Sequence, residues 1–252
     1  MAMTAATLHE QSEGRLRLGL GVSHRPVVEG WHGQTIDRPV AEMGEYVAIL
    51  RAILAGEPPP AGEKWQTGFA LSGIGPYPDL PIYVAALSPA MLRLAGEVAD
   101  GAMLWLCNPQ YIRAVVMPEL QAGRERAGKT LEGFAVVAAV PSAVVDDPAI
   151  AHASMRRDLL PYFGLPFYRA MLERSGFGDD IAAYDEAAAR GDGEGMQAAV
   201  SERFLDELCA IGSPDDVRAG LARYQDAGAD APCVGPIPRT DADATFRAAA
   251  PG

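Results

Sequence analysis

Buried apolar runs alternate with amphipathic stretches along this chain, and residues 81–106 show the pattern most clearly. The run Ile82–Leu87 has the length and β-branched content of a strand that is buried on both faces. Ser88 and Pro89 then provide an N-cap and a first-turn proline, and apolar positions recur at helical spacing. After a turn, residues 102–106 are apolar again. This pattern predicts a right-handed parallel βαβ unit.

The same alternation continues on both sides of this unit. It predicts strands at residues 15–22, 82–87, 102–106, 134–140 and 231–237. It predicts helices that end near residue 10 and that span about 42–55, 89–98, 108–127, 213–227 and 240–250, with a long helical tract at about 142–209. Residues 27–40 are expected to be a polar loop, and Phe69 and Leu71 alternate like a short edge strand. Buried strands that alternate with helices predict a parallel α/β sheet, either open or closed into a barrel.

The turn after the second predicted strand is the first candidate binding site. Ala85, Ala86, Leu87 and Ser88 place small residues and backbone N–H groups at a helix N-terminus, where an anion such as a phosphate is stabilised. Ligands of parallel α/β sheets also lie at the carboxyl ends of strands. The alternative is a structural βα turn that binds only water.

The end of the first predicted strand is the second candidate. Gly21, Val22 and Ser23 lead to His24, and the glycine allows a ligand or a neighbouring backbone to come close. A histidine suits proton transfer near neutral pH, so His24 is the candidate catalytic residue. The alternative is a histidine in a surface loop. Arg25 could balance a phosphate or remain solvated.

Composition narrows the class of protein. The chain has 252 residues and a formal net charge of −12, which argues against nucleic acid as a partner. No apolar run is as long as a membrane span, and no secretory pattern is present. Three widely spaced cysteines suggest neither a disulfide framework nor a metal site, so we expect a protein of the reducing cytoplasm.

Five segments together resemble a known family, in the order in which that family has them. They are 15–23, 45–51, 81–87, 94–101 and 211–217. The family comprises the bacterial luciferase-like flavin and deazaflavin oxidoreductases, and the branch that uses coenzyme F420, with methylenetetrahydromethanopterin reductase-like proteins, is the most similar. The match to the Rossmann dinucleotide-binding motif is weak, because Gly19-Leu20-Gly21 lacks the third glycine and the acidic partner of that motif.

The resemblance implies a TIM (β/α)₈-barrel-like fold with a helical insertion after strand seven, here at about 142–209. It implies hydride transfer between F420, or alternatively FMN, and a small organic substrate. Residues Ala85–Ser88 match positions that approach the cofactor phosphate, and Gly21–His24 match the end of strand four, beside the ring. Trp105, Leu106 and Cys107 end strand six and are expected to line the substrate cavity.

The family's first three strands have no counterpart in this sequence. We therefore expect one luciferase-like domain over residues 1–252, truncated to strands four to eight. A barrel of five strands cannot close, and its open edges favour a homo-oligomer. The competing hypothesis is a non-catalytic homologue that acts as an oligomeric binding or scaffold protein.

Overall fold

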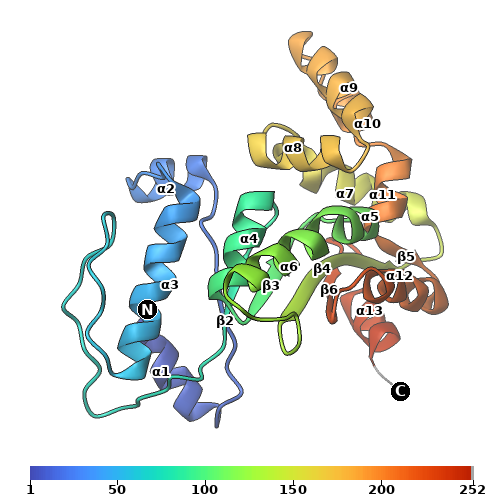
Figure 1. Cartoon of the computed structure of the whole chain (residues 1–252). Helices are drawn as coiled ribbons and strands as arrows, with labels where there is room; N and C mark the ends of the chain where they lie inside the picture. Colours follow the sequence, from blue (N-terminus) through green and yellow to red (C-terminus); the bar gives the residue numbers. More distant parts are fainter. Residues whose placement is uncertain (251–252) are drawn as a thin grey trace. The chain divides into compact units, whose positions relative to one another are not determined.

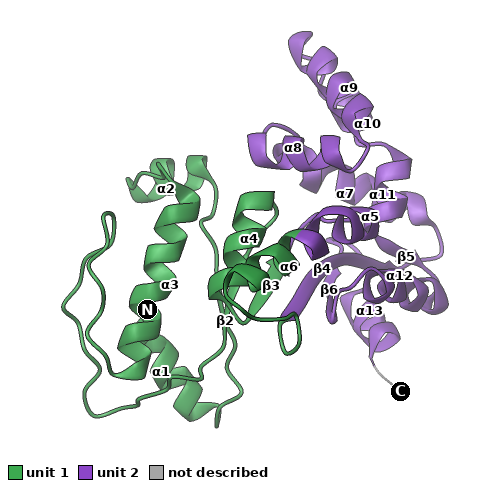
Figure 2. Ribbon diagram, in the orientation of Figure 1, with its two compact units in different colours: residues 1–103, 119–134 green, residues 104–118, 135–252 purple. Residues whose placement is uncertain are grey.

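The computed structural model describes residues 1–250, which form an α/β fold with parallel strands (Figure 1). The chain divides into two compact units, coloured separately in Figure 2. Unit 1 comprises residues 1–103 and 119–134, and unit 2 comprises residues 104–118 and 135–252, of which 251 and 252 are not described. The expectation of a single domain stays a prediction.

Unit 1 is built on the parallel strands β1 (Leu18–Leu20), β2 (Ile82–Ala85) and β3 (Gly101–Leu104), which ends one residue beyond the unit. Its helices are α1 (Ala2–Gln11), α2 (Arg25–His32), α3 (Pro39–Ala55), α4 (Pro89–Val98) and most of α6 (Met117–Arg126). The predicted βαβ unit is confirmed, because β2, α4 and β3 follow one another and the two strands pair in parallel. The predicted N-cap is confirmed as well, since Met91 N–H donates to Ser88 Oγ at 3.4 Å.

The sheet of unit 1 has one buried and one open face. Leu20, Ile82, Val84 and Ala102 are buried, as the helix-covered side of a βα unit requires. The alternate positions Gly19, Tyr83, Ala85 and Met103 are half-buried or exposed. Side chains alternate across a strand, so these four share the second face. A half-open apolar face of this kind is available to a ligand or to another surface.

Unit 2 is built around β4 (Ala135–Val144), which pairs in parallel with two other strands of the unit. Ser142 of β4 is aligned with Ala210 of β5 (Ala210–Gly212) and with Pro236 of β6 (Ala231–Pro236). Before β4, the unit contains α5 (Pro109–Tyr111) and a π-helical turn, Ile112–Val116. The remaining helices are α7 (Pro148–Phe163), α8 (Pro166–Arg174), α9 (Gly178–Ala189), α10 (Gly193–Ala198), α11 (Glu202–Leu208), α12 (Pro214–Asp226) and α13 (Ala242–Ala249).

In both units, an aspartate that precedes one strand accepts a backbone hydrogen bond from the neighbouring strand. In unit 1, Asp100 precedes β3, and its Oδ2 accepts the N–H of Ile82 at 2.8 Å while it pairs with Arg51 of α3. In unit 2, Asp230 precedes β6, and its Oδ2 accepts the N–H of Val136 at 2.8 Å. The strands of both units are therefore held by the same kind of hydrogen bond at their amino ends, away from the carboxyl ends at which ligands of parallel sheets bind.

Three expectations about local structure are wrong. Most of α2 lies within the predicted polar loop 27–40, because Pro26 stands in the first turn of this helix and Gly33 ends it with φ of 61°. Phe69 and Leu71 form no strand, since nearby glycines and prolines interrupt the extended run. The third error is the absence of β5 from the predicted strands, because a strand of three residues is too short to show a period-2 pattern.

Several boundaries also differ from the expectations. The first strand is limited to Leu18–Leu20, and β4 continues to Val144, so the helical tract begins at Pro148 instead of about 142. Among the described residues, no helix is both long and apolar enough to cross a bilayer.

Candidate functional site

The carboxyl ends of β1 and β2 bring the two predicted binding segments together. Leu20 is aligned with Val84, so the chain leaves both strands at one edge of the sheet. A Cβ placed on Gly21 would lie 3.2 Å from the Cβ of Ala85. A side chain at position 21 would therefore press against Ala85, and the glycine lets the two segments lie this close together.

The first segment has an unusual backbone. Ser23 has φ of 59°, the left-handed region that residues other than glycine seldom adopt. Gly21 and Ser23 are exposed, whereas Val22 and His24 are half-buried. Such outliers concentrate at functional sites, where the surrounding structure holds them in place.

His24 stands where the first segment becomes a helix. Its carbonyl oxygen accepts the N–H groups of Val27 and Val28 at 3.0 and 2.9 Å, and its side chain makes no capping bond to α2. The imidazole is thus placed directly after Ser23 by the start of α2. Arg25 was expected either to balance a phosphate or to remain solvated. Its guanidinium pairs with Glu29 at 2.6 Å and donates to the carbonyl of Ile36 at 2.5 Å, so it joins α2 to the loop that follows this helix.

The second segment, Ala85–Ser88, leads into the N-terminus of α4. The N–H of Ala86 donates to the carbonyl of Met103 at 3.0 Å, which continues the pairing of β2 with β3. Pro89 has no N–H group, and the N–H of Met91 is used by Ser88. Among the first three residues of α4, the amide of exposed Ala90 is therefore the donor that an anion can reach.

Met103 is a neighbour of this site that the sequence analysis missed. A Cβ on Gly19 would lie 2.6 Å from Met103 Cε and 2.8 Å from Sδ, so the thioether covers Gly19 on the open face of the sheet. The sequence predicted the two strands that contain Met103 and Ala85, but not that these two residues are aligned with each other. The strand pairing alone could have placed it.

The residues predicted to line the substrate cavity lie in unit 2. Trp105 is half-buried, whereas Leu106 and Cys107 are buried at 3% and 2% exposure. Leu106 has φ of 60°, a conformation that is rare for a bulky residue. Burial raises the pKa of the Cys107 thiol to about 12, so this side chain stays protonated and is no nucleophile at neutral pH.

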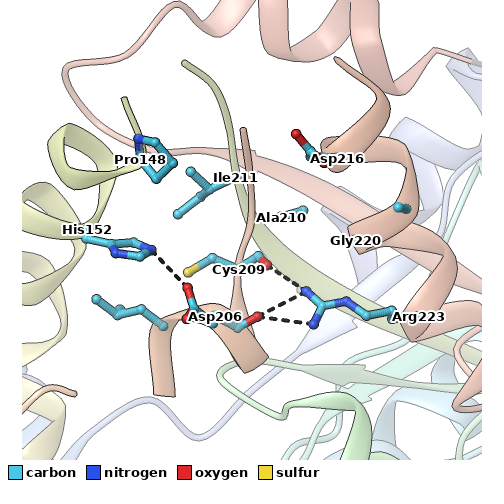
Figure 3. Close-up of a pocket in the computed structure, with 11 residues that line it drawn as sticks. Pro148, His152, Asp206, Cys209, Ala210, Ile211, Asp216, Gly220 and Arg223 are labelled. Carbon is cyan, nitrogen blue, oxygen red and sulfur yellow. Dashed lines mark hydrogen bonds and ion pairs between the residues drawn. The ribbon is translucent and has the colours of Figure 1, made fainter. Parts of the chain in front are cut away.

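A separate cavity of about 350 Å³ lies in unit 2, between α7, α11, β5 and α12 (Figure 3). Its polar groups largely pair with one another: His152 Nε2 is 3.4 Å from Asp206 Oδ1, and Arg223 donates to the carbonyls of Asp206 and Cys209. Burial also raises the pKa of the Cys209 thiol. None of the predicted site residues lines this cavity, and its arrangement is that of a structural groove that caps the end of α11.

No metal centre was expected, and the described part of the chain offers no group of three or more His, Cys, Asp and Glu side chains that could hold a metal ion. What the first two segments offer instead is an open edge with one left-handed backbone residue, one imidazole and one helix amide.

Comparison with known proteins gives the context for this geometry. The 5,10-methylenetetrahydromethanopterin reductase of Archaeoglobus fulgidus is 30% identical over 236 residues, which cover 90% of this chain and 70% of the reductase. A putative coenzyme F420-dependent oxidoreductase of Mycobacterium tuberculosis is also 30% identical, over 249 residues that cover 90% of this chain and 72% of that protein.

The fold has counterparts among solved structures. The coenzyme F420-dependent tetrahydromethanopterin reductase of Methanopyrus kandleri superimposes with a TM-score of 0.76 at 23% identity, covering 98% of this chain and 76% of that one. The sequence model that describes luciferase-like monooxygenases matches residues 1–231. The resemblance stated from the sequence is thereby confirmed, and the chain belongs to the luciferase-like monooxygenase family.

Proposed function

We propose that this protein is a deazaflavin-dependent oxidoreductase that transfers a hydride between coenzyme F420 and a small organic substrate, with FMN as the alternative cofactor. The observation that carries the proposal is the close approach of Gly21 to Ala85 at the carboxyl edge of the sheet. The names of two curated relatives, one an F420-dependent oxidoreductase and one a methylenetetrahydromethanopterin reductase, support the choice of cofactor and reaction class.

The residues at this edge fit a flat ring with a phosphate-bearing tail. Gly21 has no side chain to separate the first segment from Ala85, and Ser23 next to it takes a left-handed conformation. When bound, the cofactor supplies the carbon, C5, that gives or takes the hydride. Gly21, Val22 and Ser23 would hold the ring, and Ala85, Ala86, Leu87 and Ser88 would hold the phosphate at the N-terminus of α4.

His24 is the residue that donates or accepts the proton that accompanies hydride transfer. Reduction of a carbonyl adds a hydride to carbon and a proton to oxygen, and an imidazole nitrogen of His24 donates that proton; in the reverse direction it accepts it. The location of His24 directly after Ser23 supports this role. We assign it as the general acid and base of the proposed site.

The test is a titration of the purified protein with F420 and, separately, with FMN, followed by cofactor fluorescence. We expect saturable micromolar binding of one of them. Gly21→Leu should weaken that binding by about 10-fold or more, because its side chain would occupy the space next to Ala85. Gly30→Ala is the matched control, since a Cβ on Gly30 meets nothing within 4 Å.

A second variant separates binding from chemistry. His24→Asn should bind the cofactor as the wild type does, with turnover lowered by about 100-fold or more, which is typical of a lost general acid. Absence of saturable binding of both cofactors would contradict the proposal and favour the non-catalytic scaffold. Unchanged turnover in His24→Asn would remove only the assignment of the proton donor.

A further inference from the structure

The cavity of Figure 3 contains two side chains that the capping of α11 does not explain. Arg223 donates to the carbonyls of Asp206 and Cys209, so its guanidinium belongs to the end of that helix. Asp216 accepts hydrogen bonds from the N-cap of its own helix, α12, where the dipole favours a carboxylate. The imidazole of His152 and the carboxylate of Asp206 remain, and they face each other in the figure. All of these residues belong to unit 2.

His152 places a polar ring at the cavity with little contact to water. The residue is 9% exposed, and its Nε2 lies 3.4 Å from Asp206 Oδ1, which is an ion pair only when the ring is protonated. Within residues 1–250, no hydrogen bond reaches either nitrogen of this ring. Buried polar groups are costly without a partner, and nearly all of them in native proteins have one. The ring can therefore bond a group that enters the cavity.

Asp206 carries its charge where its own helix disfavours it. It lies in the last turn of α11, where the helix dipole favours cations, and its ion-pair partner among the described residues is the ring of His152. This pair is not needed to hold α7 against α11. Arg156 of α7 already donates to the carbonyl of Val200 at 3.0 Å and lies 3.7 Å from Glu202. A carboxylate in this place therefore gains from a positively charged group that comes beside it.

The cavity next to this pair has the size of a small organic molecule. Its volume is about 350 Å³, which lies within the range of ligand pockets. One wall is rigid, because α12 lies so close to β5 that a Cβ on Gly220 would be 2.4 Å from the Cβ of Ala210. The apolar residues of the lining are Pro148, Leu205, Ala210, Ile211, Ala219 and Gly220. An apolar ligand body gains free energy by leaving water for such a surface.

We propose that this cavity binds a small primary amine with an apolar body, held in its ammonium form by Asp206 and His152. The carboxylate pairs with the ammonium group, and an unprotonated ring nitrogen accepts one of its N–H groups. An ammonium group has three donors, so it can bond both partners at once. An anionic ligand would instead meet the charge of Asp206 and find Arg223 bound to main-chain carbonyls. The site uses none of the residues proposed to hold the cofactor and does not depend on the proposed function.

Calorimetric titration of the whole chain tests the proposal with three probes of one length. Hexylamine is the ammonium probe, hexan-1-ol is the neutral probe and hexanoate is the anionic probe. At about pH 8 we expect saturable binding of hexylamine, with hexan-1-ol and hexanoate at least about 10-fold weaker. Absence of saturable hexylamine binding up to about 10 mM, or equal binding of hexan-1-ol, overturns the proposal.

Removing the charge of Asp206 tests the ion pair. Asp206→Asn keeps the shape of a side chain that is 67% exposed, so the variant should keep the native circular dichroism. It should weaken hexylamine binding by about 10-fold or more. Asp226→Asn is the matched control, because Asp226 is an exposed carboxylate of α12 outside the lining of this cavity. Equal effects of the two variants would show only a general charge attraction and overturn the site.

The pH dependence of binding tests the part of His152. Histidine gains its charge between about pH 8 and pH 5, whereas alkylamines stay protonated. A protonated ring repels the ammonium group and pairs with Asp206, so hexylamine should bind about 10-fold more weakly at about pH 5. The other titratable or charged groups of the lining are Cys209, Asp216 and Arg223, and β5 adds none. Burial raises the pKa of the Cys209 thiol, and hydrogen bonds lower the pKa of Asp216, so both keep their charge state over this range.

His152→Gln removes the titration and keeps a hydrogen-bond acceptor at the same place. Its affinity for hexylamine should be equal at the two pH values and within about 3-fold of the wild type at about pH 8. A pH dependence that persists in this variant overturns the proposal, because another group would then control binding. Hexanoate binding that tightens toward about pH 5 in the wild type would show an anion held by the protonated ring, and it overturns the proposal as well.

Discussion

Individual side chains perform different tasks at the two edges of the strands. At the amino edges, Asp100 and Asp230 accept strand N–H groups and are structural. At the carboxyl edge of unit 1, Gly21 lies close to Ala85, Ser23 is left-handed, and His24 follows as the ionisable group of the proposed site. A substitution at the first kind of residue should change stability, and one at the second kind should change binding or turnover.

Asp216 of α12 provides a prediction about pH. Its side chain accepts hydrogen bonds from Ser213, which lower its pKa from the ordinary value. A lowered folded-state pKa means that the ionised form stabilises the fold above the unfolded-state pKa, and that this stabilisation is lost as pH falls through the folded-state value. Asp216→Asn should therefore be less stable than the wild type at about pH 7 and equally stable at about pH 2.

The measurement is the free energy of unfolding of both proteins, from urea denaturation followed by circular dichroism at several pH values between about 2 and 7. Asp243→Asn, in the first turn of α13, is the control, because the residue that caps this helix is Asp241, and the stability curve of the variant should run parallel to that of the wild type. A gap between Asp216→Asn and wild type that stays constant with pH would contradict the expectation.

Sequence could predict residues of this kind only where the partners are close along the chain. The N-caps Ser88 and Ser213 are confirmed because each bonds a residue three positions ahead. The pairing of Arg51 with Asp100 spans 49 positions and depends on the fold. These two residues lie in separate segments that carried the family resemblance, so part of that resemblance reflects a structural contact.

At the scale of elements, helices α4 and α6 of unit 1 cross at two glycines. A Cβ on Gly96 would lie 2.4 Å from the carbonyl oxygen of Leu120, and one on Gly123 would lie 2.1 Å from that of Arg93. Both neighbours are backbone atoms, which cannot move without displacing a helix. An ion pair of 2.7 Å between Arg93 and Glu119 holds the same crossing.

Gly123→Ala should therefore destabilise the protein by about 1–3 kcal/mol, the usual cost of overpacking, although alanine favours helices. The measurement is the free energy of unfolding in urea. Gly30→Ala, in the open helix α2, is the matched control and should be neutral or stabilising by up to about 1 kcal/mol. Equal stability of the two variants would show that the crossing tolerates a methyl group.

Elements were predictable where their periodicity was long. The helix α3, the strand β2 and the helix α13 all appear close to their expected positions. The helix α2 was missed because it has only eight residues and none of them is buried, so its apolar positions Val27, Val28 and Trp31 were too few to be recognised as a helical pattern. The candidate binding segments were found from strand ends, whereas Met103 and the contact of Trp105 with Tyr162 required tertiary structure.

At the scale of the whole molecule, the family relationship raises the question of self-association. β1 stands at the end of the strand order, and Gly19 in it is exposed. Unpaired strand edges are ready to bind another chain unless they are covered. The half-open apolar face of β1, β2 and β3 adds a second surface that gains from being buried.

We propose that the protein is a homo-oligomer in solution, joined through the open edge of β1. Size-exclusion chromatography with light scattering should give a mass of at least twice the 26.6 kDa of one chain. The measurement is repeated over a range of protein concentrations, since a weak association dissociates on dilution. A monomer at every concentration would refute the proposal.

The hydrogen bonds of Asp100 and Asp230 at the amino ends of the strands bear on which parts of the sequence can vary. Because strand alignment is secured by Asp100 and Asp230, the loops at the opposite edge are not needed to hold register. Their sequences can therefore drift, or be randomised in a library, while the sheets persist. New binding preferences can then arise in these loops, because the residues that hold the strands together lie elsewhere in the chain.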